Sequence, residues 1–156
     1  MSQSQILEHY GHSDFMLVIL VCVVLILVTV LFHYEVLKGI TLLLAKPRHG
    51  PRVRILYMVL GLTMLHTLEI LIFAAGYKLL SLLDLGMLSG MPSEHFYYYF
   101  YYSAVSYTTL GFGDIIPLGP LKLLTAMEAL LGLGFITWSA SFTFLEMQKL
   151  WNVNKV

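Results

Sequence analysis

The chain has 156 residues, of which 58% are hydrophobic and 12% are charged, and its formal net charge is zero. This balance excludes an ordinary small soluble domain, and without a long basic run the sequence argues against nucleic acid as a partner. Cys22 is the only cysteine, so no disulfide forms within one chain.

The N-terminal part predicts an extracellular end followed by a membrane-spanning helix. Residues 1–14 contain no Lys or Arg, so they lack the basic start of a cleavable signal peptide. From Phe15 to Phe32 the chain has no charged residue. At helical rise this stretch spans roughly 27 Å, close to the thickness of a bilayer core. A first transmembrane helix is therefore expected over residues 15–37.

Two further apolar runs are long enough to cross a membrane, although each contains ionisable residues. One predicts an outer helix over residues 55–78 and contains His66 and Glu69. The other predicts an inner helix over residues 120–146 and contains Glu128. The fold class expected is thus an all-α membrane protein with three transmembrane helices.

A shorter apolar run, "FYYYFYYSAVSY", lies between the second and third spans. At about 12 residues it is too short to cross a bilayer, which is typical of a re-entrant or buried helix. Ser93 is a candidate N-cap. We expect a helix over residues 94–107 that enters the membrane and stops partway.

The basic residues predict the orientation of the chain. Most of them lie in the connection 38–54 or the tail 147–156, while the opposite side has only Lys78 and Lys122. By the positive-inside rule, the connection and the tail are cytoplasmic and residues 1–14 face outside. The basic residues of the connection are Lys38, Lys46, Arg48, Arg52 and Arg54.

The segment "TTLGFGD", residues 108–114, follows the short run and interrupts any helix. Non-helical backbone occurs at membrane depth only where it is buried in protein or lines a watery cavity, because lipid cannot satisfy its polar groups. Gly111 and Gly113 can adopt positive φ angles that residues with a Cβ resist. An extended strand of alternating hand would turn successive carbonyls to one side, where they can bind a desolvated cation.

The longer stretch "YYSAVSYTTLGFGD" resembles the pore loop of tetrameric potassium channels, whose filter reads T-x-G-Y/F-G-D. The resemblance covers the loop and, more loosely, the flanking helices. It implies that residues 55–146 form a pore module, that the short helix is a pore helix, that residues 108–114 are the filter, and that K⁺ is the permeant ion. One loop supplies one wall of each oxygen ring, so a homotetramer is implied.

The resemblance also assigns roles to individual residues. Four residues would present carbonyls to K⁺, namely Thr109, Leu110, Gly111 and Phe112. The Thr109 hydroxyl would add the innermost ring. Five further residues would support the filter or form its outer mouth: Thr108, Gly113, Asp114, Tyr101 and Tyr102. The family usually has Val in place of Leu110 and often Tyr in place of Phe112. Because the K⁺ ligands are main-chain oxygens, the changed side chains leave selectivity intact. Phe112 lacks the hydroxyl that would tie the filter to the surrounding aromatics, which predicts a looser filter.

The tyrosines of the short helix allow two interpretations. Tyr101 and Tyr102 occupy positions where the family often packs aromatics around the filter, which is the interpretation that we favour. All of these tyrosines could instead form an interfacial belt in the headgroup region. For residues 97–99 we favour the belt.

The third span contains two glycines about 20 residues after the filter. Gly132 and Gly134 lie where the inner helix of the family commonly has a hinge, and Gly132 matches better. Glycine makes a helix easier to bend, but small residues also allow close helix packing, and the two interpretations stay open. Leu133, Thr137 and Ser141, spaced at four, are expected on one face that lines the cavity.

Ionisable residues inside the second and third spans are costly and indicate function or a partner. We hypothesise that Glu69 and Glu128 contact each other or His66 behind the filter, in a cluster whose protonation tunes gating. The alternative is a carboxyl hydrogen-bonded to Thr125 or to a pore-helix tyrosine. No ligand role is assigned to the remaining histidines, which are His9, His12, His33, His49 and His95.

Three functional classes compete. The first is a potassium-selective channel without an intrinsic voltage sensor or cytoplasmic ligand-binding domain, and not an enzyme. The second is a weakly selective cation channel. The third is a membrane enzyme or scaffold that uses His66, Glu69 and Glu128. The expected location is the plasma (cell inner) membrane. The lipid bilayer, further copies of the chain and an accessory subunit are the expected partners.

Overall fold

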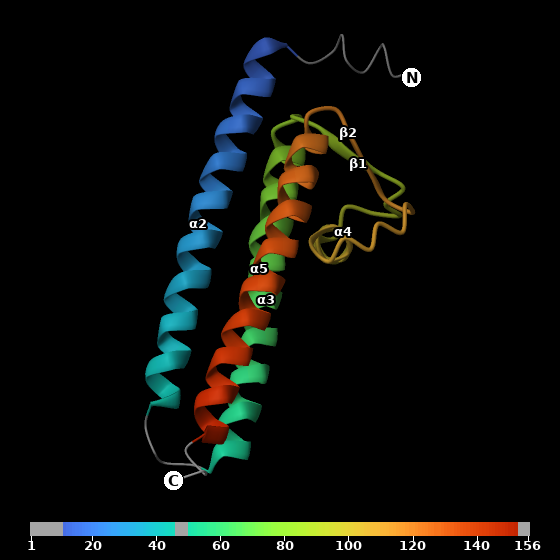
Figure 1. Cartoon of the computed structure of the whole chain (residues 1–156). Coiled ribbons are helices and arrows are strands. Elements are labelled where there is room, and N and C mark those ends of the chain that lie inside the picture. Colours follow the sequence, from blue (N-terminus) through green and yellow to red (C-terminus); the bar gives the residue numbers. More distant parts are fainter. Residues whose placement is uncertain (1–10, 46–49, 153–156) are drawn as a thin grey trace.

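Three long helices and one short helix make up most of the chain (Figure 1). The structure is a computed structural model that describes residues 11–45 and 50–152. The helices are α2 (His12–Leu44), α3 (Pro51–Leu82), α4 (Phe96–Tyr107) and α5 (Leu121–Asn152), and the strands are β1 (Met87–Ser89) and β2 (Ile116–Leu118).

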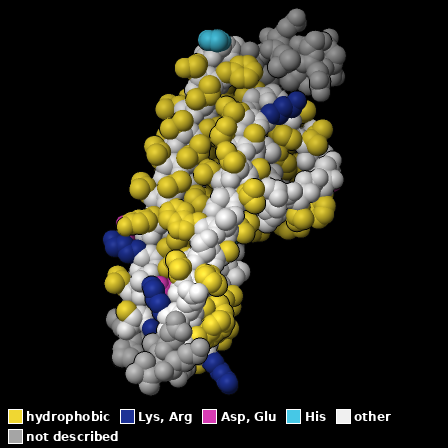
Figure 2. Space-filling model, in the orientation of Figure 1, with side chains coloured by type: hydrophobic (Ala, Val, Ile, Leu, Met, Phe, Trp, Pro, Cys, Tyr) yellow, Lys and Arg dark blue, Asp and Glu magenta, His cyan; other side chains and the backbone are white. Residues whose placement is uncertain are grey.

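The three long helices are long and apolar enough to cross a membrane, over His12–Leu44, Pro51–Leu82 and Leu121–Lys149. Hydrophobic side chains cover most of the elongated surface visible in Figure 2, and most of the visible Lys and Arg side chains lie near the end where α2 stops and α3 begins. The expected architecture, three spanning helices and a short fourth helix, is confirmed.

The long helices extend past the bounds that the apolar runs predict. The first helix was expected over 15–37, but α2 continues to Leu44, and the outer helix begins at Pro51 instead of residue 55. Pro at the first helical position is favourable because its missing N–H has no intrahelical partner there. The inner helix continues beyond 146 to Asn152. Charged residues mark where a helix leaves lipid, and helices do not have to end there.

The N-terminus of α4 differs from the prediction. His95, and not Ser93, is the N-cap, and its side chain makes no capping hydrogen bond. Tyr99 was expected in an interfacial belt, but it is buried in the core, with an exposed fraction of 4%. Tyr97, 65% exposed, has the exposure that a belt residue requires.

A short antiparallel strand pair, which the sequence did not predict, holds the two ends of the α4 region together. Met87 pairs with Leu118 and Ser89 with Ile116. Next to this pair, Gly90 has a φ of +94°, and a Cβ added to it would lie 2.1 Å from the backbone oxygen of Asp114. Only glycine allows the two segments to approach this closely.

The arrangement of the helices places α4 and the extra helix α2 on different sides of the α3–α5 pair (Figure 1). The main core lies between α3, α4 and α5, where Phe73, Tyr77, Tyr107 and Leu124 are almost completely buried. α2 packs on the same cluster through Val18 and Cys22. The short helix is therefore held by packing against the two helices that flank it in sequence.

Candidate functional site

The backbone after α4 alternates in hand. Thr108 continues the helix with φ −83°, and then Thr109, Gly111 and Gly113 have positive φ angles of 59°, 58° and 80°. Among the described non-glycine residues, only Asp84 also has a positive φ. A positive φ at Thr109 is unfavourable for a β-branched residue, so the surrounding structure must impose it.

The N–H groups of this segment point back to the last turn of α4. Leu110 N donates to Val105 O at 3.0 Å, Thr109 N to Ser106 O at 2.9 Å, and Gly111 N to Val105 O at 3.4 Å. In a trans peptide, the N–H of one residue points opposite to the C=O of the residue before it. The carbonyls of Thr108, Thr109 and Leu110 are therefore directed away from α4, as a row of oxygen ligands requires.

The other side of this row is open in a single chain. Leu110 and Phe112 are 61% and 65% exposed. A Cβ added to Gly111 or Gly113 would meet nothing within 4 Å. One chain thus presents an exposed polar backbone between exposed apolar side chains, which is costly for an isolated chain in a membrane.

The two aromatic residues expected to support the filter make different contacts. Tyr101 donates a hydrogen bond from its hydroxyl to Asp114 Oδ2 at 2.9 Å, which joins α4 to the last residue of the segment. Tyr102 is buried, and its hydroxyl lies 2.8 Å from Thr125 Oγ1 of α5. Tyr101 therefore contacts the segment directly, whereas Tyr102 holds α4, the helix before the segment, against α5.

The glycines of α5 have distinct surroundings. A Cβ added to Gly132 would lie 2.1 Å from the backbone oxygen of Tyr107, whereas one added to Gly134 would meet nothing within 4 Å. The close packing considered for Gly132 is therefore present, and bending at either glycine stays a prediction. The expected cavity residues Leu133, Thr137 and Ser141 are exposed in the single chain. Their two hydroxyls donate to the backbone of α5.

Glu128 is completely buried and accepts hydrogen bonds from two hydroxyls. Ser103 Oγ donates to Oε1 at 2.5 Å and Tyr77 Oη to Oε2 at 2.6 Å. Thr125 contacts Tyr77 and Tyr102 rather than Glu128. This group, which we call the Glu128 cluster (Glu128, Ser103 and Tyr77), joins α5, α4 and α3.

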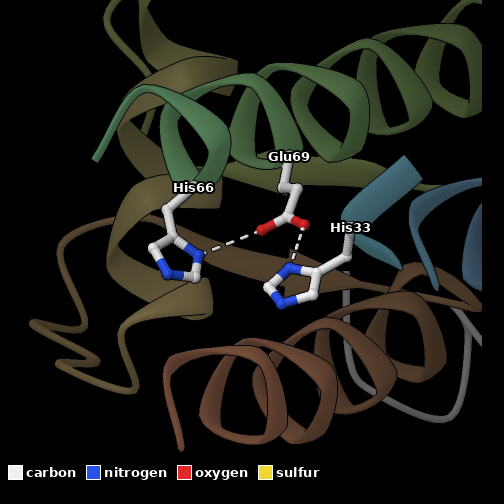
Figure 3. Close-up of side chains that lie close together, drawn as sticks. All are labelled: His33, His66 and Glu69. Atoms are coloured by element: carbon white, nitrogen blue, oxygen red, sulfur yellow. Dashed lines mark hydrogen bonds and ion pairs between the residues drawn. The ribbon is translucent and has the colours of Figure 1, made fainter. Parts of the chain in front are cut away.

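Glu69 is also completely buried, but its partners include two imidazoles (Figure 3). His33 Nδ1 lies 2.8 Å from Oε1, and His66 Nδ1 lies 3.1 Å from Oε2. Tyr107 donates its hydroxyl to Oε2 at 2.5 Å, and the same hydroxyl lies 2.8 Å from His66 Nδ1. We call these four residues the Glu69 cluster.

The hypothesis of one cluster around both carboxylates is therefore wrong in part. Glu69 contacts His66 as expected, but among the described residues no hydrogen bond joins Glu69 to Glu128. The alternative, a bond to a pore-helix tyrosine, is present for Glu69 and Tyr107. A role in proton-tuned gating stays a prediction, which the pH response of currents through Glu69→Gln and Glu128→Gln variants tests.

The sequence did not identify His33 as a partner of Glu69. His33 has no exposed surface, stacks on Phe135 with ring centroids 4.6 Å apart, and shares a group with His66 and Glu69 whose ligand atoms lie within 4.8 Å. The one available signal was a histidine directly after an uncharged run inside a spanning helix. Buried polar residues there require a partner.

Comparison with known families supports a channel. Neither a curated protein nor a solved structure matches the chain significantly. A family with the description "Ion channel" (Ion_trans_2) matches residues 65–149, more than half of the chain, and this region includes α4, the alternating segment and nearly all of α5. The chain is an integral membrane protein that belongs to this ion channel family.

Proposed function

We propose that the protein is a potassium-selective channel that conducts K⁺ passively through a filter of main-chain carbonyls. The observation that carries this proposal is the alternation of left-handed residues at Thr109, Gly111 and Gly113, with N–H groups bonded back to α4. Carbonyl oxygens that replace the hydration shell of an ion are the basis of potassium selectivity. The proposed K⁺ ligands are the carbonyls of residues 109–112.

The proposal includes a homotetramer. The exposed side chains of Leu110 and Phe112 and the open space around Gly111 and Gly113 support it, because further copies of the chain around a common axis would cover them. Thr137 and Ser141, exposed on α5, would then face the cavity below the filter. Gating by protons, by the membrane or by an accessory subunit belongs to the same proposal, with the basic connection and the tail in the cytoplasm.

Potassium flux from vesicles that contain the purified protein tests this function. We expect flux that barium blocks and a reversal potential that follows the K⁺ gradient in mixed K⁺ and Na⁺. A reversal potential near the midpoint of the two gradients would indicate a weakly selective cation channel instead. Absence of any ion flux would favour a scaffold or a membrane enzyme.

A matched pair of glycine variants isolates the role of the filter. In Gly111→Ala the added Cβ meets open space, but φ is +58°, so the strain falls on the backbone conformation itself. We expect loss of K⁺-selective flux in this variant. Gly39→Ala in α2, which also meets nothing within 4 Å, should retain it. Equal flux through both variants would contradict the carbonyl filter.

A further inference from the structure

The Glu69 cluster contains ligand atoms from two helices that meet at one point. His33 comes from α2, and His66 and Glu69 come from successive turns of α3 (Figure 3). Their ligand atoms all lie within 4.8 Å of one another. We propose that these three residues bind a divalent transition metal of the zinc class, with the Tyr107 hydroxyl next to the fourth coordination position.

The kinds of atoms in this group select the class of metal. Two imidazole nitrogens and one carboxylate oxygen form the donor set of zinc sites that keep one position open. Imidazole also suits copper, iron and nickel, whereas magnesium and calcium require mostly oxygen ligands. The described residues at this point offer two oxygen-bearing side chains, Glu69 and Tyr107, too few to coordinate a calcium or magnesium ion without imidazole.

The distances fit a site that is closed by hydrogen bonds when no ion is present. Zinc bonds of 2.0–2.2 Å at tetrahedral angles place neighbouring ligand atoms about 3.3 Å apart. The contacts of Glu69 with His33 and His66 are 2.8 and 3.1 Å, so these pairs need to separate by about half an ångström or less. The ligand atoms of the two imidazoles lie within 4.8 Å of each other, so they need to approach by up to about 1.5 Å, which requires the ring of His66, 20% exposed, to turn.

Charge provides a second argument. Among the described residues the only ion-pair partners of Glu69 are the two histidines, which carry charge only when they are protonated. A carboxylate in a membrane-spanning helix without a cationic partner is costly. A divalent cation supplies the missing positive charge and leaves a net charge of +1 with one carboxylate. If the Tyr107 hydroxyl coordinates and releases its proton to water, the site becomes neutral.

The second ring nitrogen of His33, Nε2, affects how tightly the site would bind a metal ion. His33 Nε2 is buried and has no hydrogen-bond partner. Moving the ring hydrogen from Nδ1 to Nε2, which metal binding at Nδ1 requires, therefore breaks no other hydrogen bond of that ring. Metal-bound imidazoles usually donate this N–H to an acceptor, and loss of such a partner costs about 10- to 100-fold in affinity. We expect a reversible site and not a permanently occupied one.

Metal binding would connect the extra helix to the base of the proposed filter. His33 belongs to α2, and Tyr107 is the last residue of α4, directly before Thr108. An ion held by His33, His66 and Glu69 would fix α2 against α3 at the level of this junction. The site would thus give α2 a role beyond contact with lipid.

Zinc binding to the purified full-length protein in lipid nanodiscs tests the site independently of ion conduction. The protein is stripped with a chelator, dialysed against Zn²⁺, and analysed for bound zinc and for its melting temperature. We expect about one zinc per chain and a higher melting temperature with Zn²⁺ but not with Mg²⁺. Co²⁺ in place of Zn²⁺ should give the visible absorption of a tetrahedral site.

Two variants and one control decide the result. Glu69→Gln and His33→Ala should lose the bound zinc and the zinc-dependent rise in melting temperature. His95→Ala, which changes an exposed histidine, should retain both. Equal zinc binding in all four proteins would assign the metal to surface histidines and overturn the proposal, as would absence of bound zinc in the unmodified protein. If His33→Ala fails to fold, Glu69→Gln decides, because glutamine preserves the side-chain volume.

Discussion

Glu69 and Glu128 are two completely buried carboxylates that hold the same short helix in different ways. Glu128 accepts hydrogen bonds from Ser103 in α4 and Tyr77 in α3. Glu69 accepts one from Tyr107 at the end of α4, and its other partners are imidazoles from α2 and α3. The two clusters thus fix consecutive turns of α4, one through hydroxyls alone and one through a mixed set of donors.

This difference shows how the partners of a buried acid determine what it can do. Neutral hydroxyls satisfy a carboxylate, but they are weak ligands for a transition metal, so the Glu128 cluster is suited to a structural role. Imidazoles satisfy a carboxylate and can also coordinate a metal. In addition, the Glu69 cluster connects α2 to α3 and α4, whereas the Glu128 cluster joins α3, α4 and α5.

The largest effect is expected when the Glu128 cluster loses its acceptor. Glu128→Ala leaves the hydroxyls of Ser103 and Tyr77 without this partner and creates a cavity. We expect a loss of about 4 kcal/mol in the free energy of unfolding, measured by denaturant titration in mixed micelles. Glu128→Gln retains one acceptor oxygen and should lose about 1 kcal/mol. A loss in Glu128→Gln as large as that in Glu128→Ala would contradict this expectation, because the retained acceptor oxygen and side-chain volume would then contribute little.

A smaller loss is expected when the junction between the Glu69 cluster and α5 is overpacked. In Gly132→Ala the new Cβ would lie 2.1 Å from the Tyr107 carbonyl, so α5 and the end of α4 must separate. We expect a loss of about 3 kcal/mol in the same titration. Gly134→Ala meets no atom within 4 Å and should gain up to about 1 kcal/mol from helix propensity. Tolerance of alanine at both positions would contradict the close packing at Gly132.

Two tyrosine variants compare the clusters directly. Tyr77→Phe reduces the hydroxyl donors of Glu128 from two to one, whereas Tyr107→Phe leaves Glu69 with both imidazoles. We therefore expect losses of about 2 kcal/mol for Tyr77→Phe and about 1 kcal/mol for Tyr107→Phe. Denaturant titration of the two variants under identical conditions checks the order. The reverse order would contradict the expectation that the two imidazoles compensate Glu69 for the lost hydroxyl of Tyr107.

Length and apolar composition were sufficient to predict the number and type of the helices within residues 11–45 and 50–152. An uninterrupted apolar run indicates a spanning helix, and a run of half that length indicates a helix that stops partway. The ends were predicted less well, because α2 and α5 continue through charged residues instead of ending at them. The strands β1 and β2 have three residues each, too few for any period to appear in the sequence.

The backbone conformation of the candidate site could be predicted, because it depends on the positions of glycines. Within residues 108–114, Gly111 and Gly113 stand at two of the three positions with positive φ, and a glycine is visible in the sequence. The contacts of buried side chains could not be predicted in the same way. Which face of α2 meets α3 depends on packing between helices, so the sequence did not show that His33 reaches Glu69. Likewise, Ser103 is an inconspicuous residue until the structure places it against Glu128.

The smallest effect on stability is expected at Asp114, the exposed counterpart of the two buried carboxylates. Tyr101 donates to Asp114 Oδ2 at 2.9 Å, and both side chains are accessible to water, so water can replace this bond. Tyr101→Phe should leave the melting temperature unchanged. Because the bond joins α4 to the outer end of the proposed filter, we expect a measurable decrease in the preference for K⁺ over Na⁺ in the reversal potential. Tyr97→Phe, a neighbouring exposed tyrosine, is the control.

The effect of pH separates this contact from a general loosening of the filter. Tyr101 lies outside the three spanning helices, and its hydrogen bond to Asp114 raises the pKa of the phenol above its usual value of about 10. When the folded protein raises the pKa of a group, the interaction that stabilises its protonated form is fully present below the usual pKa. This interaction is lost as the pH rises through the raised pKa. Selectivity of the unmodified protein should therefore stay constant near neutral pH and decrease only in strongly alkaline solution, while Tyr101→Phe should show no such alkaline change. A variant that retains the alkaline decrease would locate the titrating group elsewhere in the pore.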